Sequence, residues 1–570
     1  MSYRAPVTEF GFVLEHVVDF KKVQETDRFA DAQGDVVAAI LAEAGKVATE
    51  KLAPLQRIGD MRPAHLENGV VRTSPGFAEG FRAISEGGWI GVTAPPEHGG
   101  LGLPLTLSIV VNEMMAGACM ALQLNPMLTQ AQIHALEVHG DADIQKLYLP
   151  HLISGNWAGT MNLSEPQAGS DVGALRSRAE PDGEGTYRIS GQKIYISWGD
   201  SDFCENICHM VLARLPDAPS GSRGISLFLV PKFIPRADGT LGPANSLKVV
   251  SLEHKLGLHG SPTAVMEFDA AKGWLIGEPH KGLATMFTMM NNARLNTGVQ
   301  GIGVAEAGCQ IAESFAKDRR QGRTGRPLGT IVEHADVRRM LVSMRAETFA
   351  ARAIGLACAV AIDMETATGQ EGWRARAAFL TPIAKAFGTD TGHSVAQDAI
   401  QVHGGMGYIE DTGVAQLMRD VRVTQIYEGT NGIQAMDLVS RKLMDDGDAA
   451  FALLDEIEDG AEAARARFPD VAQAVWTAAE ALREATEWMV AQGDMDDRFA
   501  GAVPYLRAFA RVLGGHYHLR AAMAEDGAGP RADLCRAYVT RLLPQHAALL
   551  AEAQAGAADL FAIKPEVLGA

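Results

Sequence analysis

Hydrophobic positions recur every three or four residues over most of the chain. Near the start, residues 35–55 (DVVAAILAEAGKVATEKLAPL) have this spacing, and residues 107–124 (LSIVVNEMMAGACMALQL) are apolar on nearly every side. The first pattern is typical of an amphipathic helix and the second of a more buried one. Residues 87–104 between them are rich in glycine and proline, which predicts a loop. A helical N-terminal domain is therefore expected over residues 1–158.

The pattern changes near residue 159. Residues 186–197 (TYRISGQKIYIS) alternate, and Ser190-Gly191 at their centre predicts the turn of a hairpin. Residues 224–233 (GISLFLVPKF) predict a short buried strand that Pro231 ends. Residues 264–278 (AVMEFDAAKGWLIGE) indicate further strands. A middle β domain is expected over residues 159–278.

Helical spacing returns at about residue 283. Three long apolar patterns, 295–320, 333–363 and 374–405, predict neighbouring helices of a bundle within residues 279–445. Residues 446–570 are rich in alanine and acidic, and predict a helical extension without a recognised chemical motif. One of its helices carries six apolar residues on one face: Val471, Val475, Ala478, Leu482, Ala485 and Met489. The fold class is α+β, with four consecutive domains.

Composition narrows the functional classes. The 570 residues are 47% hydrophobic and 21% charged, which is ordinary for a globular protein. The 51 basic and 69 acidic side chains give a net charge of −18, which disfavours binding to nucleic acid or to anionic membranes. The N-terminal segment lacks the pattern of a signal peptide, and we find no apolar run of about 18 residues. A cytoplasmic protein without a membrane span is expected.

Six cysteines in 570 residues are too few for a disulfide framework. Cys204, Cys208 and His209 lie close together, but no second cluster of ligands follows at a spacing that zinc would require. We expect no metal site.

Two polar stretches carry the candidate chemistry. Residues 426–434 (IYEGTNGIQ) place one carboxylate, Glu428, before a flexible turn. In the simplest interpretation Asn431 caps a helix, and Glu428 is a loop acid near the helix N-terminus. Residues 161–171 (MNLSEPQAGSD) form a polar loop whose N–H and hydroxyl groups could hold an anion or the edge of a planar ring. This loop is not G-x-G-x-x-G, so a nicotinamide Rossmann site is unsupported.

These stretches occur in order with GQKIYIS, RRQGR and QVHGGMGY. Together they resemble the acyl-CoA dehydrogenase family, flavoenzymes that desaturate acyl-CoA thioesters, over about residues 80–445. The extension and EGTNGIQAMDL resemble the subgroup that contains the 3-methylthiopropanoyl-CoA dehydrogenases of dimethylsulfoniopropionate degradation, and related long-form enzymes. The resemblance implies FAD as cofactor.

The resemblance also implies residue roles. Glu428 matches the base that removes the α-proton of the thioester, and Gly429 beside it allows close approach of the substrate. Ser170 and Arg294 match positions near the acyl-CoA, although a solvated arginine at a helix end is an alternative for Arg294. The residues that match FAD contacts are Met161, Leu163, Ser164, Tyr195, Ser197, Arg320, Gln401, Gly404, Gly405, Thr430 and Asn431.

Two positions depart from the family pattern. Tyr195 replaces the usual tryptophan beside the flavin, so stacking on the flavin is altered. Gly432 replaces a frequent glutamine, so one hydrogen bond to the cofactor is expected to be missing. Arg320 matches a residue that reaches the FAD of a neighbouring subunit, which implies a homodimer.

The expected activity is FAD-dependent α,β-dehydrogenation of an acyl-CoA, with 3-methylthiopropanoyl-CoA as the expected substrate and an electron-transferring flavoprotein as the expected acceptor. A medium- or long-chain fatty acyl-CoA dehydrogenase is the alternative. An acyl-CoA oxidase, or a flavin-bearing DNA-binding relative without turnover, fits less well, because the charge is acidic and Glu428 is present.

Overall fold

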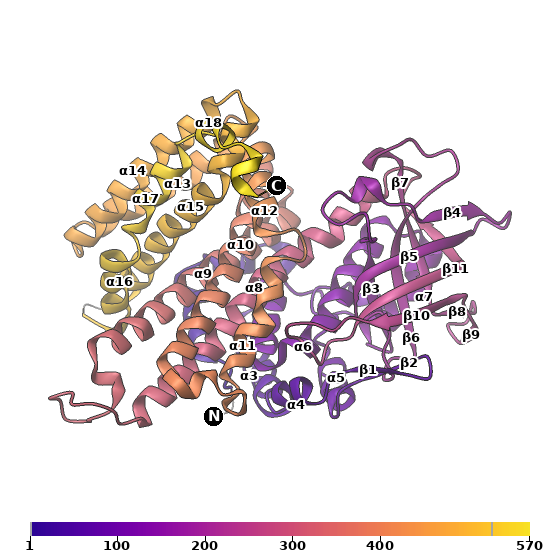
Figure 1. Cartoon of the computed structure of the whole chain (residues 1–570), viewed down its shortest axis with the longest axis horizontal. Helices are drawn as coiled ribbons and strands as arrows, with labels where there is room; N and C mark the ends of the chain where they lie inside the picture. The colour runs from indigo at the N-terminus through magenta and orange to yellow at the C-terminus, as the bar shows by residue number, and fades with distance from the viewer. Residues whose placement is uncertain (1–2, 526–527, 570) are drawn as a thin grey trace. The chain divides into compact units, whose positions relative to one another are not determined.

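The computed structural model describes residues 3–525 and 528–569 and divides into two compact units (Figure 1). Unit 1 contains Pro6–Leu41 and the chain from Arg294 onward, and unit 2 contains residues 42–293. The expected α+β organisation, with a helical N-terminal region, a β region, a helical bundle and a helical extension, is confirmed.

Unit 2 combines helices with a seven-stranded sheet. Its helices include α4 (Leu55–Met61), α5 (Phe77–Glu86), α6 (Leu105–His139) and α7 (Ala142–Ile153), and α3 (Gly34–Val47) and α8 (Gly282–Asp318) cross its boundaries. The strands are β1 (His65–Glu67), β2 (Val70–Arg72), β3 (Trp157–Asn162), β4 (Arg178–Pro181), β5 (Tyr187–Ser197), β6 (Asn206–Arg214), β7 (Ile225–Pro231), β8 (Phe233–Pro235), β9 (Leu241–Ala244), β10 (Leu247–Leu252) and β11 (Thr263–Ile276).

The large sheet has the order β10-β11-β5-β4-β6-β3, and β7 pairs with both β6 and β11. Strands β11, β5, β4, β6 and β7 therefore form a closed circuit of pairings. Its interior is filled by apolar side chains, among them Ile189, Val211, Phe228 and Met266. The predicted strand ending at Pro231 is confirmed as β7.

The predicted hairpin is wrong. Residues 187–197 form one continuous strand, β5, that pairs with β11 on one side and β4 on the other. Gly191 lies inside the strand with φ +145°, where an added Cβ would be 2.3 Å from Ser177 Oγ. A glycine within a strand often marks such a close approach, and here it was mistaken for a turn.

Helix α6 bears on the expectation that the chain has no apolar run long enough to span a membrane. It is long and apolar enough to cross a membrane by length and composition, with a mean hydropathy of 1.6 over the critical window. In the structure 94% of that window is buried, as in the core helix of a folded domain. Its 35 residues bend at Cys119, whose φ of −157° and ψ of 86° are not helical.

Unit 1 is built from helices. Its bundle contains the three long helices predicted from the sequence, α8, α9 (Ala335–Thr368) and α10 (Glu371–His403). Its other helices are α1 (Val7–His16), α2 (Phe20–Gln24), α11 (Val414–Val421), α12 (Asn431–Arg441), α13 (Asp448–Ala464), α14 (Pro469–Ala491), α15 (Met495–Ala524), α16 (Pro530–Arg541), α17 (Gln545–Ala553) and α18 (Ala558–Ala562).

Helices α8 and α10 approach each other closely through small residues. An added Cβ on Gly298 would lie 2.5 Å from the Ala384 carbonyl oxygen, and one on Gly301 would lie 2.4 Å from that of Gly388. Such distances are shorter than van der Waals contact, so both positions need glycine. Because the two helices lie so close here, Arg294 of α8 and Lys385 of α10 lie in the same region of the bundle.

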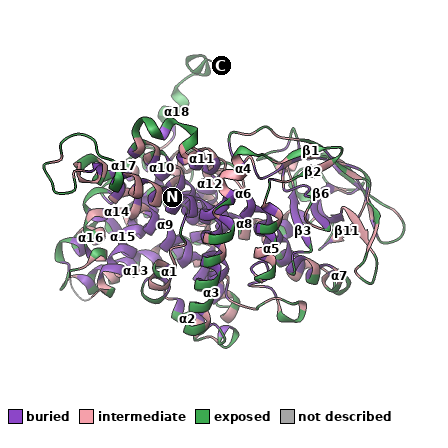
Figure 2. Ribbon diagram, turned by 90° about the horizontal axis from the view of Figure 1, so that it is seen from below, coloured by how far each residue is buried: buried purple, intermediate pink, exposed green. Residues whose placement is uncertain are grey.

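The extension packs on the bundle of the same chain. All six residues of the predicted apolar stripe on α14 are buried. Helix α15 contacts α9, α10 and α12 and is largely buried (Figure 2). Its buried residues include Tyr505, Phe509 and Leu513. The apolar face predicted for this region is thus covered within unit 1.

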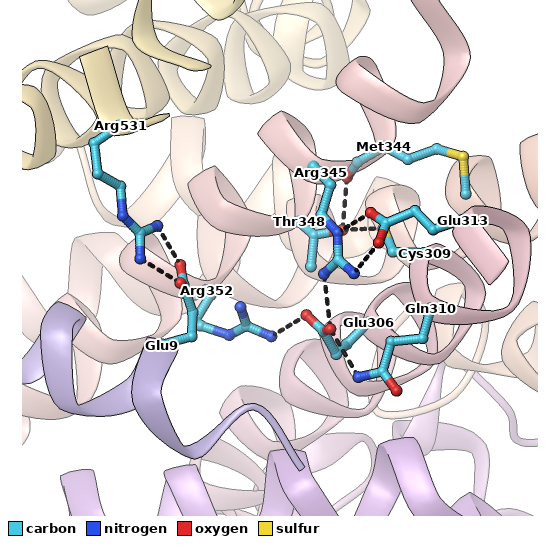
Figure 3. Close-up of polar contacts among 10 residues, drawn as sticks. All are labelled: Glu9, Glu306, Cys309, Gln310, Glu313, Met344, Arg345, Thr348, Arg352 and Arg531. Carbon is cyan, nitrogen blue, oxygen red and sulfur yellow. Dashed lines mark hydrogen bonds and ion pairs between the residues drawn. The ribbon is translucent and has the colours of Figure 1, made fainter. Parts of the chain in front are cut away.

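A buried ion network joins α8 to α9 (Figure 3). Glu306 accepts hydrogen bonds from Arg345 Nη1 at 2.7 Å and from Arg352 Nη2 at 2.9 Å. The two guanidinium groups lower the pKa of Glu306 to about 2, although burial alone would raise it. Arg345 also binds Glu313, through Nη2 and Oε2 at 3.0 Å.

The first helices of the chain are tied to its last ones. Arg531 of α16 donates from Nη1 to Glu9 Oε1 of α1 at 2.7 Å (Figure 3). Its guanidinium carbon also lies 4.2 Å from the Phe12 ring centroid. Arg520 of α15 binds Asp19 through both terminal nitrogens. Residues 6–41 therefore complete unit 1 instead of folding with the segment that follows them.

Candidate active site

The Glu428 loop lies between a short 3-10 turn, Arg422–Gln425, and α12. Glu428 has φ +56° and Gly429 has φ +84°. A left-handed conformation is uncommon for a residue other than glycine, and it persists where the surrounding structure fixes it. Gln434 Nε2 donates to the Glu428 carbonyl oxygen at 3.2 Å and holds this backbone in place. An added Cβ on Gly429 would lie 2.7 Å from the same nitrogen, so only glycine fits there.

Thr430, rather than Asn431, caps α12. The Ile433 N–H donates to Thr430 Oγ1 at 3.3 Å. The Asn431 side chain instead binds α10, where its Nδ2 donates to Asp390 Oδ1 at 2.7 Å and to Thr389 Oγ1 at 3.0 Å. The simplest sequence interpretation therefore assigned the cap to the wrong residue of the Thr-Asn pair.

Lys385 of α10 contacts the Glu428 loop and is fully buried. Its Nζ donates to the Gly429 carbonyl oxygen at 2.8 Å and to Asn431 Oδ1 at 2.9 Å. Burial lowers the pKa of Lys385 to about 7, while the charges of Glu428 and Asp390 oppose this shift. Lys385 was not predicted as a site residue, because nothing in the sequence around it distinguishes it from a surface lysine on α10.

Glu428 has the electrostatics of a general base. Burial raises its pKa to about 7, and the positive charges of Arg294 and Lys385 limit the rise. A base whose pKa lies near the working pH combines an ionised form with a strong affinity for a proton. The preceding residue, Tyr427, is also held in place, because its hydroxyl group donates a hydrogen bond to Gln300 Oε1.

Arg294 is buried in the middle of α8, with 7% of its side chain exposed. It lies 3.8 Å from Asp437 Oδ2 of α12, and its charge acts on Glu428. The alternative of a solvated arginine at a helix end is wrong for this position.

The polar loop of unit 2 follows β3. The Ser164 carbonyl oxygen accepts a hydrogen bond from the Ile194 N–H at 3.0 Å, which sets Leu163 and Ser164 beside β5. Met161 is buried at the end of β3, and Ser170 is exposed further along the loop. The structure thus brings Leu163, Ser164 and β5 together, with Ser170 at the solvent-exposed part of the loop.

A buried ion pair shapes this loop. Lys193 Nζ donates to Glu165 Oε1 at 2.8 Å and to the Leu163 carbonyl oxygen at 3.0 Å. Glu165 also accepts from the Arg176 N–H at 2.7 Å and from Ser177 Oγ at 2.6 Å. These contacts lower the pKa of Glu165 to about 2, against the effect of burial. This pair was not predicted, although a lysine at an inward position of β5 was a usable signal in the sequence.

The side chain of Tyr195 is 63% exposed, and its backbone is left-handed with φ +60°. Ser197 follows two residues later on the same strand, whereas Trp198 is completely buried. Unit 2 therefore presents an uncovered aromatic ring next to a polar loop, as a flat, hydrogen-bonding cofactor ring requires.

Unit 1 carries a cavity of about 400 Å³ between α8 and the end of α10, lined by Ile311, Ser314, Phe315, Asp318, Arg319, His403 and Thr412. The Phe315 and His403 rings stack with centroids 4.2 Å apart. Gln401, Gly404 and Gly405 flank His403 at the end of α10 and in the following turn, Gly404–Tyr408. The arginine that lines the cavity is Arg319, the neighbour of Arg320. A cation beside aromatic rings fits the phosphate-linked adenine half of FAD.

Among residues 3–525 and 528–569, no group of three or more His, Cys, Asp or Glu side chains is placed to hold a metal ion. Cys208 is buried in β6, and His209 Nδ1 lies 2.8 Å from Thr160 Oγ1.

The sequence matches three consecutive domains of one family. The acyl-CoA dehydrogenase N-terminal domain matches residues 36–156, the middle domain 160–271 and the C-terminal domain 280–443. The chain belongs to the acyl-CoA dehydrogenase family. This acyl-CoA dehydrogenase is thus an FAD-dependent oxidoreductase. Its extension matches a further domain, described as acetyl-CoA dehydrogenase C-terminal like, over residues 453–564.

Individual relatives support the same family assignment. The chain is 42% identical over 533 residues to a 3-methylmercaptopropionyl-CoA dehydrogenase of Ruegeria pomeroyi, covering 90% of each chain. It is 34% identical over 480 residues to a butyryl-CoA dehydrogenase of Syntrophomonas wolfei, covering 80% of this acyl-CoA dehydrogenase and 78% of that protein. The fold is similar to that of an acyl-CoA dehydrogenase from Bacillus anthracis complexed with FAD, with a TM-score of 0.75, 18% identity and coverage of 99% and 93%.

Proposed function

We propose that this acyl-CoA dehydrogenase oxidises 3-methylthiopropanoyl-CoA to its 2,3-enoyl-CoA, with Glu428 as the base that removes the α-proton. The observation that carries the role of Glu428 is its environment. It occupies a left-handed position, lies near two buried cations and has a pKa raised to about 7.

The proton transfer needs a base that is ionised yet basic. Burial makes the Glu428 carboxylate a stronger proton acceptor than an exposed one, and Arg294 and Lys385 keep part of it ionised near neutral pH. The negative charge that develops on the thioester oxygen needs a fixed donor, for which we propose the backbone N–H of Glu428. The close fit of Gly429 and Gln434 keeps that backbone in one orientation.

FAD, when bound, would supply the acceptor for the β-hydrogen, which leaves as hydride with its electron pair. We propose that Tyr195, Ser197, Met161, Leu163 and Ser164 of unit 2 contact its ring system. We propose that the part of FAD outside the ring system is contacted by Arg320, Gln401, Gly404, Gly405, Thr430 and Asn431. We add Arg319 to this set because it lines the cavity. Ser170, Arg294 and Gly429 are proposed to contact the acyl-CoA.

The test of Glu428 is Glu428→Gln, which keeps the shape of the side chain and removes the base. We expect the variant to retain FAD and to bind acyl-CoA, while kcat falls by about 10²–10⁴-fold. Glu410→Gln, at a carboxylate that is 55% exposed and paired with Arg419, is the control and should keep wild-type kcat. Retention of more than a tenth of the activity in Glu428→Gln, equivalent to about 1.4 kcal/mol of barrier, would refute the assignment.

The substrate is proposed from the 42% identity to the Ruegeria pomeroyi enzyme. Initial rates with butanoyl-, 3-methylthiopropanoyl-, octanoyl- and palmitoyl-CoA and an artificial electron acceptor test it. The highest kcat/KM is expected with 3-methylthiopropanoyl-CoA. A preference for octanoyl- or palmitoyl-CoA would instead indicate a fatty acyl-CoA dehydrogenase, which is the second candidate.

We propose an electron-transferring flavoprotein as the physiological acceptor. Such a flavoprotein should reoxidise the reduced enzyme faster than air does. Rapid oxygen consumption with acyl-CoA alone would indicate an oxidase. A shift of DNA mobility by the purified protein would indicate a DNA-binding relative, against the expectation from its net charge of −18.

A further inference from the structure

Asp390 of α10 collects hydrogen bonds from three separate parts of unit 1. Arg507 of α15 donates to Asp390 Oδ2 from Nε at 3.0 Å and from Nη2 at 2.9 Å. Asn431 Nδ2 and Gln425 Nε2 each donate to Asp390 Oδ1 at 2.7 Å. One carboxylate therefore joins the extension to both ends of the loop that carries Glu428.

The connection continues to the backbone beside Glu428. Asn431 Oδ1, on the amide that donates to Asp390, accepts from Lys385 Nζ at 2.9 Å. The same ammonium group donates to the Gly429 carbonyl oxygen at 2.8 Å. A continuous path of hydrogen bonds thus runs from Arg507 through Asp390, Asn431 and Lys385 to Gly429.

Each hydrogen bond of this path restricts the orientation of the next side chain in the path. Asp390 fixes the amide of Asn431 in one of its two orientations, because the nitrogen must face the carboxylate and the oxygen must then face Lys385. Lys385 is fully buried, so an ammonium group that lost one acceptor would be costly to keep in place. Arg507 is the member of the path that belongs to the extension.

We propose that the C-terminal extension positions the Glu428 loop for catalysis through Arg507, which acts on Asp390 and, through it, on Asn431 and Lys385. The proposal rests on the proposed function of Glu428 as the base. Arg507 and Asp390 are positioning residues, since neither is placed at the reacting atoms. The extension, which carries no chemical motif of its own, thereby gains a role in the reaction.

A neighbouring ion pair supplies a matched control. Arg511 lies one turn further along α15 and donates to Glu347 Oε1 of α9 at 2.8 Å. This pair also joins the extension to the bundle, but Glu347 makes no described hydrogen bond to the Glu428 loop. Arg507→Ala and Arg511→Ala each remove one arginine between the extension and the bundle, and only Arg507→Ala breaks the path.

The first experiment uses the FAD-loaded full chain. We expect Arg507→Ala to lower kcat by about 3–10-fold with less than about a twofold change in KM, because misplacement of a catalytic group reduces turnover. Arg507→Lys, which keeps one charged donor, should recover most of that loss. Arg511→Ala should lower the thermal midpoint but keep kcat. Wild-type kcat in Arg507→Ala, or equal loss of kcat in both alanine variants, would overturn the proposal.

A second readout does not depend on turnover. Hydrogen exchange of peptides that span residues 424–436 should be faster in Arg507→Ala than in the wild type, and unchanged in Arg511→Ala. Unchanged exchange in Arg507→Ala would overturn the proposal. If instead exchange changes as expected while Glu428→Gln keeps its activity, the failure lies with the proposed base.

The charges around the loop give a third test. Lys385 faces Glu428, Asp390 and Arg294, and Glu428 faces Lys385 and Arg294, while Arg294 also faces Asp437 and Arg441 of α12. Asp390→Asn removes a negative charge that favours protonated Lys385, which in turn favours ionised Glu428. The midpoint of the kcat profile should therefore move to higher pH. A midpoint that stays in place, or moves to lower pH, would overturn the proposal.

Discussion

Lys193 donates a hydrogen bond from Nζ to Glu165 Oε1 over 2.8 Å, and both side chains are buried. The pair lies between β5 and the polar loop that follows β3. Because Lys193 also binds the Leu163 carbonyl oxygen, the loop cannot shift without separating the two charges.

We therefore expect Glu165→Gln to destabilise the protein by about 3–5 kcal/mol, since it leaves Lys193 buried without its counter-charge. The content of FAD per chain should fall as well, because the loop carries Leu163 and Ser164. Thermal unfolding and flavin absorbance measure the two effects.

Glu267→Gln is the matched control. It breaks the exposed pair with Lys248 in the same sheet, also at 2.8 Å, and should change stability by less than about 1 kcal/mol. Equal effects of the two substitutions would show that the buried pair has no special role in holding the loop.

The rate of flavin reduction should depend on pH with a midpoint near 7. Burial raises the pKa of Glu428 to about 7, so below this pH the base is protonated and cannot accept the α-proton. The rate should rise about tenfold per pH unit on the acid side and level off above about pH 8. Stopped-flow reduction between pH 5.5 and 9 tests this, and a flat profile down to pH 5 would contradict it.

Glu428→Gln should be more stable than the wild type at neutral pH. The raised pKa means that the unfolded chain ionises Glu428 above about pH 4.5, whereas the folded chain does so only near pH 7. Stability of the wild type is therefore lost as pH rises through this window, and the amide of the variant does not titrate. We expect a gain on the order of 1 kcal/mol at pH 8, because Lys385 and Arg294 lose a partner and offset the rest.

The comparison of the two proteins at low pH is the internal control. At pH 4.5 the Glu428 carboxyl is neutral in the folded chain and only about half ionised in the unfolded chain, so most of the advantage of Glu428→Gln should disappear. An advantage that is the same at pH 4.5 and pH 8 would refute the linkage between ionisation and stability.

Deletion after Lys442 should give insoluble or flavin-poor protein. It removes α15, whose apolar face lies against α9, α10 and α12, and it also removes Arg507. Exposure of that surface favours aggregation.

Light scattering of the full-length chain should show a dimer. A soluble, fully active truncation, or a stable tetramer of the full chain, would contradict these expectations.

The long helices were predictable because their patterns are repeated many times. The patterns over 295–320 and 333–363 fall almost entirely on α8 and α9, and the stripe of α14 is buried as expected. The β region was predictable as a region but not strand by strand. A glycine such as Gly191 is compatible both with a turn and with a strand position that Ser177 approaches closely. Only the pairing with neighbouring strands distinguishes these two structures.

The candidate site was predictable only where it is local in the sequence. Glu428 stands out through the motif around it, and Gly429 through the turn that it permits. Lys385, Asp390 and Arg507 carry no such signal, since Arg507 and Asp390 are 117 positions apart and meet only through the packing of α15 on α10. Arg319 and Arg320 are adjacent in the sequence, and Arg319 is the one that lines the cavity of unit 1.

The bonds that tie α1 and α2 to α15 and α16 have a consequence for synthesis on the ribosome. Residues 42–293 of unit 2 emerge as one continuous stretch and can fold as soon as they leave the exit tunnel. Glu9 and Asp19 emerge first, yet their partners Arg531 and Arg520 are translated about 500 residues later. At rates of about 5–20 residues per second this is a delay of roughly 25–100 seconds. Throughout that interval the buried residues of the first two helices, such as Phe10 and Phe20, lack their final cover, so this segment is where a nascent chain would most need a chaperone.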